Sequence, residues 1–190
     1  MTTKLIAVGV LAVVIAGLVS VTFPTSTLLG NAQEDEVQPS TIQVGEYFYG
    51  APEYQAPVGD AAKPEKVVAT ITGAAKGEIV LVLKNVGKLE HEVQSALFLD
   101  TTETQITSFD ASGKEISKVE TVGALREVEV QPGTTAQVAL TLDETLVRAF
   151  EDDPNLEMKF ELACQSGHDK RDTAKDHYQM GMRGWIVLKP

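Results

Sequence analysis

The sequence predicts an all-β protein, a sandwich of short strands preceded by one apolar N-terminal helix. Three observations lead to this fold class. Short strand-like runs rich in Val and Thr recur along the chain, turn signals with Gly or Pro separate them, and little helical periodicity lies between them. The chain has 190 residues, of which 15 are Gly and 8 are Pro. The part that follows the apolar start is long enough for one domain with its own core.

Residues 1–23 are expected to be a signal peptide or a membrane anchor, followed by a linker over residues 24–40. Residues 5–19 contain no polar side chain and follow Lys4. The apolar stretch is nearly long enough to cross a bilayer as a helix, which favours an uncleaved anchor. The small-residue sequence Gly30-Asn31-Ala32 leaves cleavage open. Because the positive flank stays in the cytoplasm, the rest is expected in the periplasm or at the outer face of the cytoplasmic membrane.

The strands are expected within a single domain, residues 41–190. The first run alternates apolar and polar residues, Gly73 and Gly77 separate the second from the third, and a Gln131-Pro132-Gly133 turn joins the fifth to the sixth. In chain order, the predicted strands are residues 41–49, 66–72, 78–83, 91–99, 126–130, 134–142, 158–164 and 185–188.

Three segments fit this strand pattern less well. Residues 49–64 are rich in Pro and Ala, which is typical of a loop. Residues 100–123 are polar, with weak strand candidates at 106–109 and 116–122. Residues 143–155 are expected to hold a short helix.

The charge balance is acidic, with 27 Asp and Glu against 16 Lys and Arg and a net charge of −11. Such a surface repels nucleic acid and attracts basic partners. The sequence also lacks a Gly-x-Ser-x-Gly nucleophile motif and a Gly-rich phosphate loop. Nucleic-acid binding and these two enzyme classes are therefore not expected.

The residues with metal-binding chemistry gather in the last part of the sequence, with one further residue far upstream. Cys164 ends a predicted strand, His177 and Met182 precede the last strand, and His91 begins the fourth. Two imidazoles, a thiolate and a weak axial thioether form the ligand set of an electron-transfer copper site. Because Cys164 is the only cysteine, zinc-finger and iron–sulfur ligand spacings and an intramolecular disulfide are excluded.

Three stretches resemble the cupredoxins, the type 1 blue copper family that includes plastocyanin, azurin, rusticyanin and sulfocyanin. The sequence HYQMGMRG at 177–184 is similar to the family's His-x4-Met ending. The sequence LKNVGKLEHEV at 83–93 is similar to its strand with an Asn followed by the first His ligand, and VEVQPGTTAQVALTL at 128–142 to its Pro-Gly turn between strands. The resemblance covers most of residues 41–190 and implies a Greek-key β-sandwich that holds one copper ion cycling between Cu(I) and Cu(II).

The same resemblance implies which residues form the copper site. His91, Cys164 and His177 would be the strong ligands, and Met182 the weak axial one. Asn85 would tie the loop before His91 to the Cys164 segment by hydrogen bonds, and would orient the ligands without binding copper itself.

The sequence departs from the family in the distance between the cysteine and the second histidine, because His177 lies 13 positions after Cys164 and a charged stretch, residues 169–176, intervenes. His168 is therefore an alternative ligand. The intact His-x4-Met spacing favours His177. His168 would then lie next to the copper ligands without binding the ion, or near the surface. Met180 is an alternative axial ligand, and the spacing favours Met182.

The expected function is single-electron transfer through a mononuclear type 1 copper site, with a cytochrome or a terminal oxidase as the redox partner. The chain is expected not to be an enzyme, because three histidines without a His-x-His pair offer no second copper centre. Copper storage or delivery outside the cytoplasm is the alternative function, followed by a role as a subunit of a copper oxidoreductase.

Overall fold

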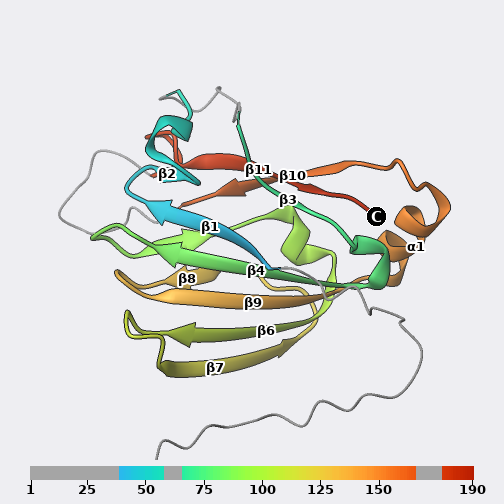
Figure 1. The fold of residues 1–190 in the computed structure, drawn as a ribbon, viewed down its shortest axis with the longest axis horizontal. Coiled ribbons are helices and arrows are strands. Elements are labelled where there is room, and N and C mark those ends of the chain that lie inside the picture. Colours follow the sequence, from blue (N-terminus) through green and yellow to red (C-terminus); the bar gives the residue numbers. More distant parts are fainter. Residues whose placement is uncertain (1–38, 58–65, 166–176) are drawn as a thin grey trace, which may run out of the picture. The chain divides into compact units, whose positions relative to one another are not determined.

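A computed structural model describes residues 39–57, 66–165 and 177–190 of the chain (Figure 1). The compact unit that carries the fold runs from Asp35 to Pro190. The expected leader, residues 1–23, and most of the expected linker lie outside the described residues. No helix in the described ranges has the length and apolar character needed to cross a membrane.

The larger of two facing layers is a mixed sheet, which has six strands among the described residues, in the order β2-β1-β4-β9-β6-β7. β1 and β4 run parallel, and the other neighbouring pairs run antiparallel. β7 lies at one edge of this sheet, as Figure 1 shows. The strands of this sheet are β1 (Ser40–Gly45), β2 (Phe48–Tyr49), β4 (Glu78–Asn85), β6 (Thr101–Phe109), β7 (Glu115–Val122) and β9 (Thr135–Leu142).

The second layer is smaller and carries the segments around the candidate metal ligands. β11 lies in the middle of a three-stranded sheet, antiparallel to β10 and parallel to β3. β5 and β8 form a short antiparallel pair, and a bridge from Gln94 to Ala163 joins this pair to β10. The strands of this layer are β3 (Val67–Ile71), β5 (His91–Val93), β8 (Val128–Val130), β10 (Met158–Ala163) and β11 (Arg183–Leu188).

Helical segments in the described ranges are short and lie between strands. The longest is α1 (Glu144–Asp152), which begins after Asp143, whose side chain accepts a hydrogen bond from the Thr145 backbone N–H. α1 buries Leu146 and Phe150 on its inner face. The 3₁₀ turns are η1 (Pro52–Tyr54), η2 (Ala74–Lys76) and η3 (Ala96–Leu99).

Alternating side chains from both layers form one continuous core. In β4, Ile79, Leu81 and Leu83 point inward, and residues between them face outward. Burying each such side chain contributes about 1.5–3 kcal/mol relative to leaving it exposed. Every residue of the described core lies between Ile42 and Leu188. The segment 35–190 therefore contains the whole of this core and is expected to fold without the leader.

The structure confirms the all-β class and most of the predicted strands, and it corrects three boundaries. The first predicted strand, residues 41–49, is a hairpin of β1 and β2 that turns at Glu46 and Tyr47. The run predicted over residues 91–99 ends as a strand at Val93 and continues into η3, because Ser95 caps a turn by accepting from the Leu97 backbone N–H. Residues 100–123, whose strand signal was weak, form the two long strands β6 and β7.

Candidate metal centre

Three donor atoms from distant parts of the sequence meet inside the protein. The Nδ1 atoms of His91 and His177 are 3.3 Å apart. The Sγ atom of Cys164 lies 3.4 Å from Nδ1 of His177 and 3.8 Å from Nδ1 of His91. All three residues are buried, with His177 the most exposed at 8%. Among the described residues, this is the one cluster of at least three His, Cys, Asp or Glu ligands close enough to hold a metal ion.

His91 is placed by the short strand pair at the start of β5. Its backbone pairs with Val130 of β8, and the strand alternates so that His91 and Val93 point inward while Glu92 lies between them at the surface side. The same alternation that builds the core therefore points the imidazole into the protein.

Cys164 directly follows β10 and is held from two sides. Ala163 exchanges two backbone hydrogen bonds of 2.9 Å with Gln94, which follows β5. The Cys164 backbone N–H donates to the Met182 carbonyl at 3.2 Å. The thiol is thus fixed both to the His91 strand and to the segment that carries Met182.

A tight turn carries His177 and Met182. The Met182 N–H donates to the His177 carbonyl at 3.0 Å, and the Gly181 N–H donates to the Tyr178 carbonyl at 3.0 Å. Gly181 adopts a φ of +94°, and a Cβ atom there would lie 2.0 Å from the Ala56 carbonyl oxygen. The Ala56 N–H in turn donates to the Gly181 carbonyl at 2.9 Å. Only glycine fits this position, because both the backbone angle and the close approach exclude a side chain.

Met182 is fully buried, and its backbone hydrogen bonds run to both His177 and Cys164. Met180, the alternative axial residue, is half-buried, and its carbonyl accepts a hydrogen bond from the Gln55 side chain. His168 and the charged stretch 169–176 lie outside the described residues. The structure thus brings His177 to His91 and Cys164.

Asn85 is buried at the end of β4, and its hydrogen bonds differ in part from the expectation. Its Nδ2 donates to the carbonyls of Leu89 and Val130, both at 2.8 Å, and its Oδ1 accepts from the Gly87 N–H. Asn85 therefore shapes the loop before His91, as expected. It ties that loop to β8 rather than directly to the Cys164 segment, because β8 is the strand that pairs with β5.

Two supporting residues, Glu46 and Tyr47, were not identified from the sequence. They form the turn between β1 and β2, where Tyr47 has a φ of 67°. The Glu46 carboxylate accepts hydrogen bonds from the backbone N–H groups of Lys88 and Leu89. The Tyr47 ring meets the His177 ring edge-on, with centroids 5.4 Å apart. One hairpin tip thus supports both histidines. The positive φ at a non-glycine residue is visible only in the structure.

Burial sets the protonation state of His91. Desolvation first, and then the neighbouring His177, lower the pKa of His91 to about 4, against a weaker opposing effect of Glu46. His91 is therefore neutral near pH 7, which is the form that binds a metal ion. Its Nε2 is buried without a hydrogen-bond partner within the described ranges. Burial, with the nearby Cys164 as the second cause, raises the pKa of Tyr49 well above its ordinary value.

The donor distances fit a bound metal ion. Metal–nitrogen bonds of about 2.0 Å and metal–sulfur bonds of about 2.3 Å, at angles of about 110–120°, separate two nitrogens by about 3.3–3.5 Å and a nitrogen from a sulfur by about 3.5–3.7 Å. The measured nitrogen–nitrogen distance of 3.3 Å and nitrogen–sulfur distances of 3.4 and 3.8 Å lie within about 0.1 Å of these ranges. Two nitrogens and one thiol sulfur could therefore take an ion with little movement.

Comparison with known proteins supports the fold. No protein-family model and no curated protein matches the sequence. Among solved structures, a multicopper oxidase from Campylobacter jejuni, described as a metallo-oxidase, superposes with a TM-score of 0.51 at 13% identity, over 90% of this chain and 34% of the oxidase. The McoA multicopper oxidase from Aquifex aeolicus gives a TM-score of 0.47 at 17% identity, over 86% of this chain and 31% of that protein. The fold is thus cupredoxin-like in the broad sense.

The comparison corrects one expectation. The chain was expected not to be an enzyme, but the Campylobacter protein whose fold it resembles is a multicopper oxidase, which is an enzyme. The chain spans about a third of the length of the Campylobacter protein, with 34% covered. The small number of histidines is therefore no argument against a place within an oxidase, since a second copper centre can draw its ligands from elsewhere.

Proposed function

We propose that this protein transfers single electrons through a mononuclear type 1 copper site. His91, Cys164 and His177 would hold the ion, and Met182 would be the weak axial ligand. The observation that carries the proposal is the convergence of two imidazole nitrogens and one thiol sulfur, from three buried residues, within 4.8 Å of one another. A copper ion there would supply one-electron chemistry between Cu(I) and Cu(II).

The donor set favours copper over zinc. Structural zinc sites take four strong ligands from Cys, His, Asp or Glu. The cluster contains three such residues within the described ranges. A buried methionine beside them, tied to Cys164 and His177 through its backbone, suits the long axial contact of a type 1 copper site.

The protein holds the donors from several directions, which suits electron transfer. Asn85 and Glu46 fix the loop before His91. The Gln94–Ala163 bridge fixes the approach to Cys164, and residue Ala56 holds the turn at Gly181. Ligands that move little between two oxidation states keep the reorganisation small, so this bracing supports fast transfer.

Redox partners and location follow from the charge and the leader. The net charge of −11 favours a basic redox protein, such as a cytochrome or an oxidase component, as the partner. The apolar start of the sequence supports a site of action in the periplasm or at the outer face of the cytoplasmic membrane, with the chain anchored there if the leader stays uncleaved.

A second candidate function is a redox subunit of a copper oxidoreductase. The structural likeness to multicopper oxidases, of which the chain spans about a third, favours it. In that case the same four residues would deliver electrons to a catalytic centre formed with another subunit. Both candidate functions use the same copper site, so the copper content of the isolated chain does not distinguish them. Oxygen consumption in the presence of native partners does.

The visible spectrum tests the copper site. Segment 35–190 loaded with Cu(II) should show an intense thiolate-to-copper band and bind one copper per chain. The band should be lost in Cys164→Ser and His177→Ala and kept in His168→Ala. Loss in His168→Ala alone would move the second ligand to His168. A wild-type protein that binds copper without this band would refute the type 1 site.

Met182→Leu tests the axial ligand separately from the other three. The substitution keeps a similar volume and removes the thioether. The band should persist, and the reduction potential should rise, because loss of a donor disfavours Cu(II) more than Cu(I). An unchanged potential would exclude Met182 as the axial ligand, and Met180→Leu is the matched control.

A further inference from the structure

The edge strand β7 carries exposed apolar side chains. It is the last strand of the larger sheet, and no described strand pairs with its outer edge. Ile116 is 55% exposed, Val119 53% and Val122 91%. Folded proteins usually protect such an edge, because its free N–H and C=O groups pair readily with another strand. An edge strand with three exposed branched side chains is therefore suited to a partner.

The pairing of β7 with β6 shows which backbone N–H and C=O groups of β7 point away from β6. The Gly123 N–H donates to the Thr102 carbonyl at 2.7 Å, which marks residues 102 and 123 as a hydrogen-bonded pair with β6. Since hydrogen bonding alternates along an antiparallel strand, Ser117, Val119 and Thr121 face β6. Lys118, Glu120 and Val122 then present their N–H and C=O groups outward.

A second copy of the same strand matches this edge in one register. With a two-fold axis at Val119, antiparallel pairing places Lys118 opposite Glu120 of the second copy, and the symmetry repeats this pair. Ser117 then meets Thr121, and Val119 meets Val119. Ile116, which lies at the bulge where β7 shifts against β6, meets Val122 just beyond the regular stretch. This register therefore places opposite charges opposite each other and apolar side chains opposite each other.

The neighbouring registers fail. In antiparallel pairing, opposite residues share a face of the sheet, so the two-fold axis can move only by whole residues along β7. An axis at residue 118 places Lys118 opposite Lys118 of the second copy. An axis at residue 120 places Glu120 opposite Glu120. Of these three registers, the one centred on Val119 alone avoids a like-charge pair.

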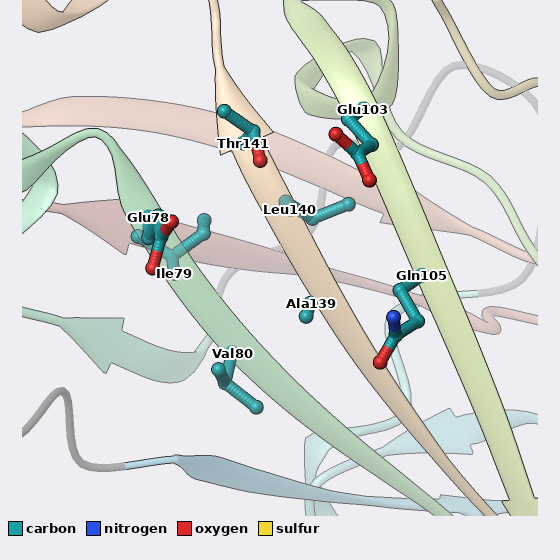
Figure 2. Close-up of a pocket in the computed structure, with 8 residues that line it drawn as sticks. All are labelled: Glu78, Ile79, Val80, Glu103, Gln105, Ala139, Leu140 and Thr141. Atoms are coloured by element: carbon teal, nitrogen blue, oxygen red, sulfur yellow. The ribbon is translucent and has the colours of Figure 1, made fainter. Parts of the chain in front are cut away.

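The outer face of the sheet favours this pairing. Lys118 lies 3.3 Å from Glu120 within the same strand, and Gln105 of β6 donates to Glu120 at 3.0 Å. Figure 2 shows Gln105 and Glu103 on β6 beside Ala139 and Thr141 on β9. These four residues help to line a hollow of about 230 Å³. In the paired register, Lys118 of a second copy would join this polar row, bringing a cation to an acidic face.

We propose that the protein forms a two-fold symmetric dimer through antiparallel pairing of β7, centred on Val119, so that the larger sheets of two copies become continuous. Such an interface is isologous and closed, so it produces dimers and not fibres. The proposal uses no part of the metal centre, and a failure of either leaves the other standing.

Charge reversal tests the register. In sedimentation velocity, segment 35–190 should show a concentration-dependent dimer. Lys118→Glu and Glu120→Lys should each weaken dimerisation by about tenfold or more, because each places two like-charge pairs in contact. The double variant K118E/E120K should restore the dimer. Lys114→Glu makes the same charge change outside β7 and should leave the dimer intact.

Cross-linking tests the axis. Val119→Cys places two cysteines at a close, non-hydrogen-bonded pair, so mild oxidation should yield a covalent dimer. Ser117→Cys places them several residues apart and should not, and the buried Cys164 is shared by both variants. A wild-type monomer at the highest soluble concentration would overturn the proposal. Dimerisation that is unchanged by the charge reversals would overturn it too, and so would equal cross-linking of the two cysteine variants.

Discussion

Gly181→Ala is expected to be among the most damaging single-methyl changes in the protein. The new Cβ would lie 2.0 Å from the Ala56 carbonyl oxygen and 2.9 Å from its carbon, in a backbone with a φ of +94°. The Ala56 carbonyl is a backbone group and cannot rotate away as a side chain could. The two segments must therefore separate, and the Ala56–Gly181 hydrogen bond of 2.9 Å is lost or stretched.

The magnitude follows from three contributions. A left-handed backbone costs an L-residue about 1–2 kcal/mol. The lost hydrogen bond costs about 1 kcal/mol, and the forced displacement of packed backbone about 1–3 kcal/mol. The free energy of unfolding should therefore fall by about 3–6 kcal/mol. Gly133→Ala is the matched control, because Gly133 has a φ of +71° with nothing within 4 Å of the added Cβ. It should lose only the conformational part, about 1–2 kcal/mol.

Denaturant unfolding of metal-free segment 35–190 measures both variants against the wild type. The difference between them isolates the contact with Ala56 from the backbone angle. In the copper-loaded protein, Gly181→Ala should also change the thiolate-to-copper band, because the same turn carries His177 and Met182. Equal losses of stability in the two variants would refute the close approach of residues 56 and 181.

Three further predictions concern residues that brace the site or the core. Asn85→Ala removes three hydrogen bonds and should cost about 2–4 kcal/mol in denaturant unfolding, whereas the exposed neighbour Lys84→Ala should stay within about 0.5 kcal/mol. Backbone N–H groups, that of Lys88 above all, lower the pKa of Glu46 below its ordinary 4.5. The stability that Glu46 adds is thus present above that pH and lost as the pH falls through its folded pKa. The difference between wild type and Glu46→Gln should therefore be constant near neutral pH and shrink in acid, measured on metal-free protein; a difference that grows in acid would contradict it. Phe150→Ala should cost about 3–5 kcal/mol, since α1 buries this ring, and Glu151→Ala almost nothing.

The sequence predicted strands well where one face of a strand is buried. β4 is a continuous run of branched residues from Ile79 to Leu83, which indicates a strand, and β9 alternates apolar residues with Gln137 and Thr141, which indicates both the strand and its inner face. β6 and β7 are different, because most of their side chains are partly or fully exposed and β7 lies at the sheet edge. Without a buried face there is no alternation to read, so these two strands gave only a weak signal.

The sequence predicted residues that the structure brings together at the candidate site, and did not predict the residues that support them. His91, Cys164 and His177 are rare residue types at distinctive spacings, and the structure brings them together. Glu46 and Tyr47 belong to common residue types, and their role depends on a hairpin that places them beside residues far away in the sequence. A contact of that kind leaves no local pattern, so only the fold reveals it.

The separation of the ligands along the chain determines when the site can exist. His91 and His177 are 86 residues apart, and their side chains meet only after β5, β10 and β11 have docked. Cys164, His177 and Met182 lie close together in the sequence, but the proposed site also needs His91, so its full set of ligands forms only with the fold. If copper binds there as proposed, the complete site forms late in folding, and the appearance of colour during refolding would time the assembly of the domain.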